Sequence, residues 1–586
     1  MRKFTILLFF SVLILRINAQ GIYNNGAHIV VSGNTYVVVN GNTGNVLNEN
    51  GVIDLTGKLK LGGNFTNNTA TTNAFGTLAS GSEVIFAGDE TQTIGGSTTA
   101  VFTFDKLTIN SGTQVRVAAG KQLTLNGDLT NNGTLIIGAN DEEQSTVKIS
   151  GSVSDEGVYK VETNLTAGRN WYVSSPVSGA KSSVFDAASN PVYWYDEVHG
   201  STVPWALIND NITDLTPMKG YIATVPTTGN VTFTGGTLNN TDETLTVYRT
   251  AGQTKEGFNL VGNPYPAYFD FDAATKQDIM ETMWYRSRNE ANTGWVFDTY
   301  NTTTNLGVNP SGKTITGKVP PMQAFWVRVS PSKTSGTINF AKSFTSHIDN
   351  AGNIRRAPKE EIQQFVRLRL YKEDSYDETI VAFFPKASDE SDNYDSPKML
   401  NASATVPDIY SIAGNESMAI NSLKKFEGER RIPLFYDTQQ NGNFKISAKE
   451  IMGFSPMSSI GLYDVALGKE HNLLLDGDYE FSSESVKNMS RFELIVKVPS
   501  ITTGNENVPS NDVQFLQQAN NFIEIRIADL YRENAKYRIH NAIGQVLQTD
   551  NITQNSSFIN LPYTPGIYNI TLIKGNKTYY HNIIIK

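Results

Sequence analysis

The chain has 586 residues, a formal net charge of −9 and no cysteine. This length exceeds what one hydrophobic core supports, so we expect roughly three to five domains. The charge is spread without long basic runs, which excludes a nucleic-acid binder, and the absence of cysteine excludes disulfides and thiolate metal sites. Gly, Asn and Thr are abundant and helix formers are sparse, so we predict an elongated, multidomain, all-β protein.

The N-terminus has the features of a secretory signal. Arg2 and Lys3 precede an apolar run, residues 4–15, and the small residue Ala19 stands just before Gln20. We therefore expect a signal peptide at residues 1–19. The run is shorter than the roughly twenty residues that a membrane-spanning helix needs, and no later stretch approaches that length. We expect no transmembrane helix, and delivery through the periplasm to the cell surface or the medium.

Residues 20–158 repeat a short pattern of alternating apolar residues. Residues 59–68 recur sixty-four positions later as residues 123–132, with shorter echoes at 107–110 and 147–151. Each such unit can bury its apolar side only against the next, which predicts a β-solenoid of the β-helix type. Asn and Thr at matching positions should form side-chain ladders along the stack. The pattern is similar to filamentous, haemagglutinin-like and adhesin-like solenoids, and this resemblance implies adhesion.

Residues 159–345 contain a second duplication. Trp194 and Trp205 lie eleven residues apart, and so do Trp284 and Trp295. Residues 173–176 parallel residues 261–264, and residues 217–222 parallel residues 321–326. We interpret the two copies as tandem, Trp-rich β modules. They resemble the Gly-Asn-Pro-Tyr-Pro repeat of exported Bacteroidetes proteins, whose motif stands at residues 262–266. We expect one short helix, residues 273–282 in the second copy, capped by Asp272.

The chain then continues as two further β domains. Polar linkers are predicted at residues 346–363 and 499–514, on either side of strict apolar alternation over residues 364–498. That alternation predicts a β-sandwich. The last domain, residues 515–586, consists of short apolar stretches separated by Asn, Gly and Pro turns, which predicts a small, Ig-like β-sandwich.

The last domain carries two short motifs. The first comprises Asn541, Gly544 and Gln545, the second comprises Gly566 and Tyr568, and the chain ends at Lys586. In order and spacing these pieces resemble the type A C-terminal sorting domain of type IX secretion cargo from Bacteroidetes. Residues 364–498 are similar to the module that often precedes it. The resemblance implies docking on the type IX machinery, although residues 518–521 replace the familiar Tyr-Pro-Asn-Pro opening.

Catalytic and metal-binding patterns are weak. Residues 307–314 satisfy the phosphate-loop pattern through Lys313 and Thr314, but the following residues leave no room for a helix, so we predict an ordinary loop and no nucleotide cofactor. The six histidines are scattered singly, without zinc spacing. Turn chemistry explains the remaining candidates better than function does. These are the carboxylate pairs Asp270 with Asp272 and Asp476 with Asp478, and a calcium loop of Asp437, Asn441 and Asn443.

The aromatic residues are the best candidates for a binding site. Flat faces for a glycan or anchors for a protein partner are offered by Trp194, Trp205, Trp284, Trp295 and Trp326. Their recurrence in both copies also fits a shared core. We favour an exported, non-enzymatic surface or secreted protein with an adhesive, structural or binding role. The alternative is a secreted carbohydrate-active enzyme whose carboxylates converge only in three dimensions.

Overall fold

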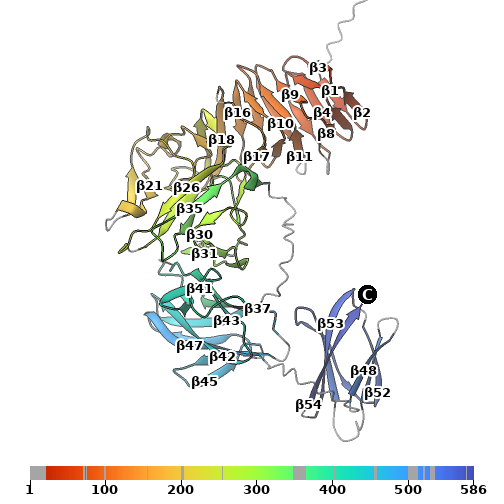
Figure 1. The fold of residues 1–586 in the computed structure, drawn as a ribbon, viewed down its shortest axis with the longest axis vertical. Coiled ribbons are helices and arrows are strands. Elements are labelled where there is room, and N and C mark those ends of the chain that lie inside the picture. The colour runs from red at the N-terminus through yellow and green to blue at the C-terminus, as the bar shows by residue number, and fades with distance from the viewer. Residues whose placement is uncertain are drawn as a thin grey trace, which may run out of the picture. The chain divides into compact units, whose positions relative to one another are not determined.

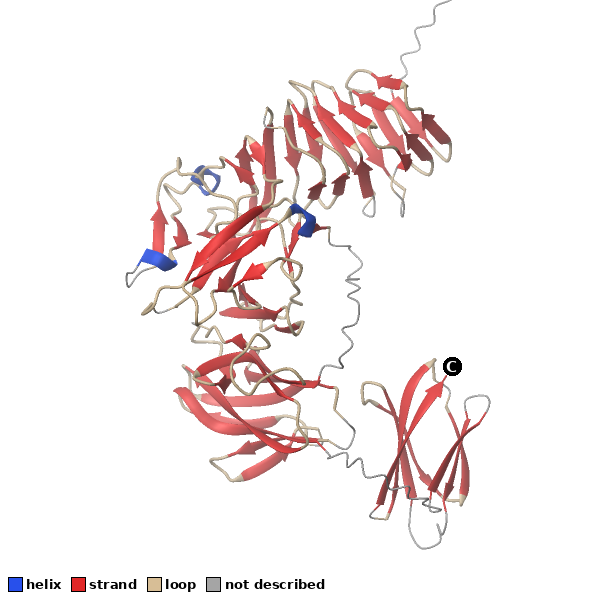
Figure 2. Ribbon diagram, in the orientation of Figure 1, coloured by secondary structure: helices blue, strands red, loops and turns tan. Residues whose placement is uncertain are grey.

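The structure is a computed structural model. It describes residues 21–69, 73, 75–97, 101–154, 156–199, 204–253, 255–347, 364–401, 403–454, 458–474, 476–498, 513–518, 522–527, 535–561, 563–575 and 577–585. The predicted signal peptide, most of both linkers and Lys586 lie outside this part. The chain forms two compact units, residues 1–356 and 357–586 (Figure 1). Strands dominate both, as predicted, and the helices within the described residues are three short 3-10 turns, Ser182–Phe185, Glu197–His199 and Lys342–Phe344 (Figure 2).

The first unit begins with the predicted β-solenoid, whose strands stack in parallel. One side is formed by β1 (Gly21–Asn24), β4 (Asn45–Asn48), β7 (Phe65–Asn67), β10 (Thr91–Gly96), β13 (Gln114–Val117), β16 (Thr134–Ile137) and β18 (Val158–Leu165). A second side is formed by β3 (Tyr36–Val39), β6 (Lys58–Leu61), β9 (Glu83–Phe86), β12 (Lys106–Ile109) and β15 (Leu129–Asn131). Two shorter sheets complete it: β2 (His28–Val31), β5 (Val52–Leu55) and β8 (Phe75–Leu78), then β11 (Val101–Phe104), β14 (Gln122–Leu125) and β17 (Thr146–Ile149).

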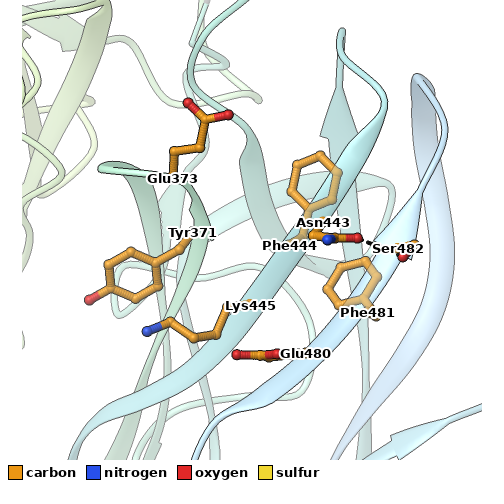
Figure 3. Close-up of a pocket in the computed structure, with 8 residues that line it drawn as sticks. All are labelled: Tyr371, Glu373, Asn443, Phe444, Lys445, Glu480, Phe481 and Ser482. Atoms are coloured by element: carbon orange, nitrogen blue, oxygen red, sulfur yellow. Dashed lines mark hydrogen bonds between the residues drawn. The ribbon is translucent and has the colours of Figure 1, made fainter.

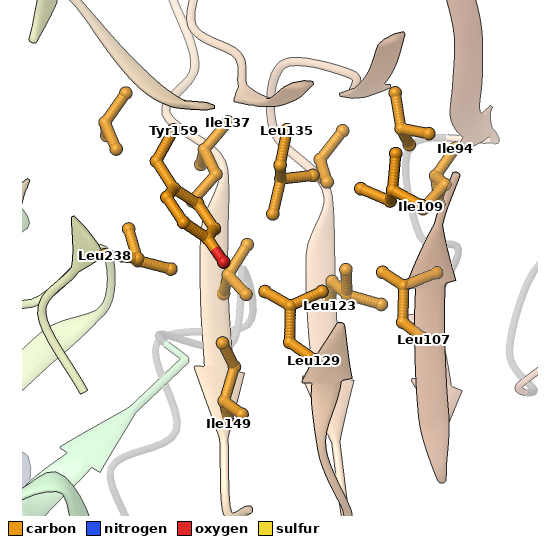
Figure 4. Close-up of a cluster of buried hydrophobic side chains, with 14 of the residues drawn as sticks. Ile94, Leu107, Ile109, Leu123, Leu129, Leu135, Ile137, Ile149, Tyr159 and Leu238 are labelled. Atoms are coloured by element: carbon orange, nitrogen blue, oxygen red, sulfur yellow. The ribbon is translucent and has the colours of Figure 1, made fainter. Parts of the chain in front are cut away.

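Alternate residues of these strands fill the solenoid interior. Leu107, Leu123 and Leu135 come from three different sheets and are fully buried (Figure 4), and along one sheet Val115, Leu135 and Tyr159 stack as register partners. The predicted side-chain ladder is confirmed for asparagine, since Asn48 Nδ2 donates to Asn67 Oδ1 at 3.3 Å on the adjacent rung. Parallel rungs therefore satisfy buried amides by pairing them with the rung above and below.

The segment that recurs after 64 residues does not occupy the same place in two turns of the solenoid. Its two copies lie in different sheets, and what they share is the turn between two strands. Leu59 lies on β6 in the second side, whereas its echo, Leu123, lies on β14 in one of the short sheets. Rung length also varies: Val46 pairs with Phe65, nineteen residues on, while Phe65 pairs with Ile94, twenty-nine residues on. The shared sequence suits a turn between two strands, and such turns occur at more than one corner.

The two modules cover the C-terminal end of the solenoid. Strand β18 continues the parallel stack from β16 and pairs on its other edge with antiparallel β24 (Gly229–Gly235). The amide of Val147 on β17 donates to the Pro266 carbonyl of the second copy at 2.8 Å. The His347 ring hydrogen-bonds to the Thr146 hydroxyl at 2.6 Å, and burial lowers the pKa of His347 to about 4. These contacts cover the last strands of two of the solenoid's sheets, β18 and β17.

The two modules share one strand order. The first copy's sheet runs β19 (Trp171–Val173), β23 (Tyr221–Ala223), β21 (Val192–Tyr195) and β22 (Trp205–Ile208). The second runs β27 (Phe258–Gly262), β34 (Ala324–Arg328), β30 (Thr282–Arg288), β31 (Trp295–Asn301) and β32 (Leu306–Val308). The β18–β24 pair of the first copy matches the pair of β26 (Glu243–Tyr248) and β35 (Ser335–Phe340) in the second. The smaller strands are β20 (Val177–Ser178), β25 (Thr237–Leu238), β28 (Tyr268–Asp270), β29 (Lys276–Gln277), β33 (Lys318–Val319) and β36 (Thr345–Ser346).

Reciprocal contacts join the copies. The Ser174 amide donates to the Met322 carbonyl, and at the equivalent positions the Gly262 amide donates to the Met218 carbonyl, both at 2.9 Å. Met218 and Met322 both have left-handed backbone, with φ of 64° and 57°. A Cβ on Gly262 would lie 2.1 Å from the Ser174 Cβ. The duplicated sequence therefore packs against itself with approximate two-fold symmetry, and only a very small residue fits at position 262.

The expected helix at residues 273–282 is wrong. Lys276 and Gln277 form β29 and pair with β35, and Ile279 forms a bridge to Val329. Asp278 has φ of 57°, which a right-handed helix excludes. Pairing with β35 and burial of Ile279 outweigh the helix propensity of the local sequence.

The second unit begins with one continuous sheet that folds over a single core. Its strands are β37 (Gln364–Lys372), β38 (Ser375–Phe384), β39 (Ser396–Pro397), β40 (Asp408–Ala413), β41 (Glu416–Lys424), β42 (Gly428–Thr438), β43 (Gly442–Met452), β44 (Ser459–Asp464), β45 (Lys469–Asn472), β46 (Tyr479–Ser483) and β47 (Val486–Val498). The sheet curls enough for the Tyr479 hydroxyl on β46 to donate to Asp464 on β44 at 2.8 Å.

The C-terminal domain is the predicted two-sheet sandwich. One sheet contains β48 (Val513–Gln518), β49 (Phe522–Ile527) and β52 (Ser556–Asn560). The other contains β51 (Val546–Ile552), β50 (Ala535–Asn541), β53 (Gly566–Lys574) and β54 (Lys577–Ile585). All pairs are antiparallel, and Ile523, Ile539, Ile570 and Ile583 are fully buried between the sheets. No helix among the residues described for the whole chain is long and apolar enough to cross a membrane.

Candidate functional site

The predicted tryptophans divide into core residues and partly exposed residues. Trp284 is fully buried against Phe258, and Trp326 is 5% exposed. Both belong to the core of the modules. Trp194, Trp205 and Trp295 are half-buried. For these three, the surroundings decide whether a ligand can reach the ring.

Each half-buried tryptophan has a different environment. The ammonium of Lys219 lies 2.9 Å from the Trp194 ring centroid, and burial lowers the pKa of Lys219 to about 8. Lys219 therefore covers the Trp194 ring. Trp205 packs on Trp326, with centroids 5.9 Å apart, and its free side lines a hollow. Trp295 lies beneath the guanidinium of Arg288, 4.3 Å from its centroid.

Three hollows in the first unit share lining residues and form one groove, which we call the inter-copy groove. The first has a volume of about 420 Å³ and the second of about 350 Å³, and Asn170 lines both. The third, of about 160 Å³, shares five residues with the second. These shared residues are Trp171, Tyr172, Tyr268, Pro320 and Gln323. The groove therefore runs from the first copy, across the junction between the copies, to Gln144 of the solenoid.

The first hollow is mainly apolar and the second is basic. The first is lined by Asn170, Pro191, Tyr193, Trp205, Ile222, Ala223 and Thr224. The second contains four basic residues and one acidic residue, and it is lined by Arg169, Asn170, Trp171, Tyr172, Tyr268, Tyr285, Arg286, Ser287, Asp298, Lys313, Thr314, Ile315, Thr316, Lys318, Pro320 and Gln323. Of the four cations, Lys318 is paired with Asp270 at 2.5 Å. Arg169, Arg286 and Lys313 have no carboxylate within ion-pair distance among the described residues.

Two residues that line the basic hollow each carry a buried donor with no hydrogen-bond partner in the described part of the chain. These donors are the Nε–H of Arg169 and the hydroxyl of Tyr285. The guanidinium of Arg169 lies over the Trp171 ring at 4.0 Å, which fixes its plane. Burial raises the pKa of Tyr285 well above its ordinary value, so the hydroxyl remains protonated. Because both atoms are closed to solvent, they lie behind the surface of the hollow and mark a poorly hydrated part of its wall.

The residues that match the phosphate-loop pattern do not form a phosphate-binding loop. Residues 307–314 follow β31 and are succeeded by β33, not by a helix. The amides of such a loop therefore do not converge at a helix N-terminus, as nucleotide binding requires. Lys313 and Thr314 instead line the basic hollow. Sequence alone indicated an ordinary loop at this place and missed its position on the groove wall.

The candidate carboxylates take part in local contacts. Asp270 pairs with Lys318, and Asp272 accepts from the Tyr300 hydroxyl at 3.2 Å. Asp478 pairs with Lys445, and Asp476 accepts from the Asn472 amide at 3.2 Å. Neither pair faces the groove.

The candidate calcium residues likewise serve turns. Asp437 accepts from the Tyr410 hydroxyl at 2.9 Å, Asn441 from the Ser485 amide at 2.7 Å, and Asn443 from the Ser482 hydroxyl at 2.8 Å. These oxygens satisfy separate donors and do not converge on one point. Over the part of the chain that the structure describes, no group of three or more His, Asp or Glu residues could hold a metal ion.

A further hollow lies on the sheet of the second unit. It has a volume of about 540 Å³ and is lined by residues of β37, β43 and β46, with Tyr371, Lys445 and Glu480 on neighbouring strands (Figure 3). Lys445 is already paired with Asp478 at 3.0 Å. Its cation is therefore satisfied, which makes this hollow a weaker candidate than the inter-copy groove.

The sorting-motif residues form two turns of the C-terminal domain. Asn541 accepts from the Gln545 amide at 2.9 Å, and Gly544 has left-handed backbone with φ of 82°. The Tyr568 hydroxyl donates to the Thr564 carbonyl at 2.7 Å, just before Gly566. The motifs therefore shape both turns. The remaining motif residue, Lys586, lies outside the described residues.

Sequence reasoning missed the residues that make the groove basic. No sequence pattern pointed to Trp171, Arg169 or Arg286. Trp171 has no tryptophan counterpart in the second copy, and the arginines belong to no motif. One signal was present, since Arg286 and Arg288 alternate on one strand opposite Trp295. The meeting of residue 169 with residue 286 depends on how the copies pack.

Comparison with protein-family models places most of the chain in one family. A family model described as a domain of unknown function (DUF8693) matches residues 73–496. The matched range includes all three hollows of the groove and stops before the C-terminal domain. A search of curated proteins found no match.

Proposed function

The chain belongs to the DUF8693 family, and we propose that it is an exported, non-enzymatic binding protein that holds a saccharide chain in the inter-copy groove. The observation that carries this proposal is the continuity of three hollows along one groove. A saccharide chain is long, and successive sugar rings need successive sites. A single closed pocket would instead favour a small ligand.

The lining of the groove suits sugars. Tyr193 and Trp205 line the first hollow, and Trp171 and Tyr268 line the next two. Aromatic rings offer flat apolar faces, while their polar edges and nearby amides hydrogen-bond to hydroxyl groups. Asn170 stands where the first two hollows meet and is exposed, so its amide is available to a ligand.

The enzymatic alternative finds less support in the groove. Most glycosidases need two carboxyl groups on opposite sides of the scissile bond. Asp298 is the one carboxylate among the residues that line the three hollows. It is buried and accepts from the Ser311 amide at 3.0 Å. Binding is therefore the role that this lining favours.

The proposal places the protein at the cell surface or in the medium. Support comes from the N-terminal signal pattern and from the resemblance of the tail to type IX sorting domains. On the C-terminal domain Ile567 and Ile584 form a cross-strand pair and are 56% and 57% exposed. Exposed apolar pairs of this kind suit recognition by a partner protein, here the type IX machinery.

Binding is tested with an exposed tyrosine. Tyr193→Ala should raise the dissociation constant for a bound polysaccharide about tenfold, because a stacking face is lost from the first hollow. Tyr248→Ala is the matched control, since Tyr248 is exposed on β26 of the same unit but lines none of the three hollows. Affinity electrophoresis in polysaccharide-containing gels measures both. Equal losses in the two variants would contradict the proposed site.

Export is tested by deletion. Removing residues 515–586 should leave the protein in the periplasm of a bacterium with type IX machinery, because the proposed docking domain is gone. Cell fractionation and surface labelling measure the result. Asn541→Ala should weaken export less, since it disturbs one turn of an otherwise folded domain. Surface display of the truncated chain would overturn the export proposal and leave the binding proposal untouched.

A further inference from the structure

We propose that the groove selects acidic saccharides, with the carboxylate or sulfate group held in the basic hollow by Arg169, Arg286 and Lys313. This inference rests on the proposed saccharide-binding function and names the ligand class. It goes further because aromatic faces by themselves do not distinguish neutral from charged sugars. The distinction comes from the charges.

The first step concerns unbalanced charge. With Lys318 paired to Asp270, three cations and the single carboxylate of Asp298 remain in the lining of the basic hollow. Yet the whole chain has a net charge of −9. Two other arginines of the same unit are paired with carboxylates, Arg116 with Glu162 and Arg249 with Glu256 at 2.7 Å. A local excess of positive charge in an acidic protein is the electrostatic complement of an anion.

The second step concerns geometry. Arg169 comes from the first copy and Arg286 from β30 of the second, so the two guanidinium groups approach the hollow from opposite copies. Aromatic rings hold both: Arg169 lies over Trp171 at 4.0 Å, and Arg286 lies 5.2 Å from the Phe297 centroid. A guanidinium held in a fixed plane presents its N–H groups as a fork that matches two oxygens of a carboxylate or sulfate.

The third step concerns desolvated donors. The Nε–H of Arg169 and the hydroxyl of Tyr285 are buried and have no partner among the described residues. These atoms are closed to solvent and do not themselves contact a ligand, but the poorly hydrated wall around them strengthens the attraction between the neighbouring guanidinium and an anion. Lys313 is exposed at the rim, where an ammonium can attract an anion from solution without a desolvation penalty.

The experiment compares polysaccharides that differ only in charge. Polygalacturonate and its fully methyl-esterified form share one backbone, and dextran sulfate with dextran gives the equivalent sulfate pair. The intact mature chain should bind at least one acidic polymer at least tenfold more tightly than its neutral partner. The two pairs show whether carboxylate or sulfate is the preferred source of the charge. Binding should weaken steeply with salt, because rim charges are screened.

Two variants locate the effect. Lys313→Gln should lower affinity for the preferred acidic polymer about five- to tenfold, and Arg286→Gln with Lys313→Gln about a hundredfold, while the loss for the neutral polymer should be much smaller. Lys160→Gln is the control, because Lys160 lies on β18 of the same unit outside the hollows and should have no effect. Circular dichroism verifies that each variant is folded.

The outcomes separate this inference from the proposed function. Equal binding of acidic and neutral polymers would overturn the acidic preference and keep saccharide binding. Acidic preference that survives in the double variant would also overturn the inference, since the anion would then bind elsewhere. Failure of the folded wild-type chain to bind any of the four polymers would count against both.

Discussion

Replacing Lys398 by Met should lower the free energy of unfolding of the second unit by about 3–5 kcal/mol. The Lys398 ammonium lies 2.5 Å from a carboxylate oxygen of Asp377, and the two side chains are 2% and 0% exposed. The same oxygen accepts from the Ile409 amide at 2.8 Å. Met has similar volume and no charge, so the loss comes from an uncompensated buried carboxylate and not from packing.

The neighbouring carboxyl group of Asp408 explains how one cation, Lys398, can balance the charge of this buried cluster. Asp408 also lies in this buried cluster, and burial, reinforced by Asp377, raises the pKa of Asp408 well above its ordinary value. Burial therefore favours the protonated form of Asp408, which makes Asp377 the main anion beside Lys398. Removing Lys398 leaves no second cation to take its place among the partners described for Asp377.

The measurement exploits where the tryptophans lie. All six fall between residues 171 and 326, in the first unit. Tryptophan fluorescence therefore follows only that unit during urea unfolding, while hydrogen exchange of β38 and β40 follows the second. Lys398→Met should reduce protection of β38 and β40 and leave the fluorescence transition unchanged.

The double variant Asp377→Asn with Lys398→Met should recover most of the loss, because the amide oxygen of Asn still accepts from Ile409. An equal loss in both variants would show that packing, not charge, is responsible.

Asn263→Ala should lower the free energy of unfolding of the first unit by on the order of 3 kcal/mol. The Asn263 side chain is fully buried and donates to the carbonyls of Ala267, Val319 and Pro320 at 2.8, 3.1 and 2.9 Å. Its oxygen accepts from the Tyr265 amide at 2.9 Å. Alanine would remove these hydrogen bonds from buried backbone groups, which is the larger part of the expected loss, although the Pro320 carbonyl would keep the Gln323 amide as a donor at 3.3 Å.

The first copy supplies the matched control. Ser175 occupies the position equivalent to Asn263, and its hydroxyl donates only to the Val177 carbonyl, at 2.7 Å. Ser175→Ala should therefore cost about 1 kcal/mol. Urea unfolding followed by tryptophan fluorescence measures both variants. Equal effects at the two positions would mean that the amide network of Asn263 contributes little.

These contacts also show how far the repeat motif could be interpreted from sequence. Asn263 stands in the Gly-Asn-Pro-Tyr-Pro motif, and the structure gives its neighbours a role as well. Residue 262 must be glycine-sized because it packs against Ser174. The Tyr265 hydroxyl donates to the Phe340 carbonyl at 2.7 Å. The duplication was visible because equivalent residues recur at equivalent spacing. The reciprocal packing of the copies was not, because no local pattern encodes which surfaces meet.

The amino-acid sequence by itself determined the strand-rich class, the solenoid and the sandwich at the C-terminus, because alternation of apolar residues is a local property that follows directly from side chains pointing to opposite faces of a strand. Local propensity failed at residues 273–282, where pairing with β35 replaced the expected helix. Only the tertiary structure decided which tryptophans are core, that Lys313 lines a groove, and that Arg169 and Arg286 face the same hollow. Those facts depend on contacts between residues distant in the sequence, from Trp284 with Phe258 to Arg169 with Arg286, and such contacts are set by packing of whole elements and not by any short stretch of chain.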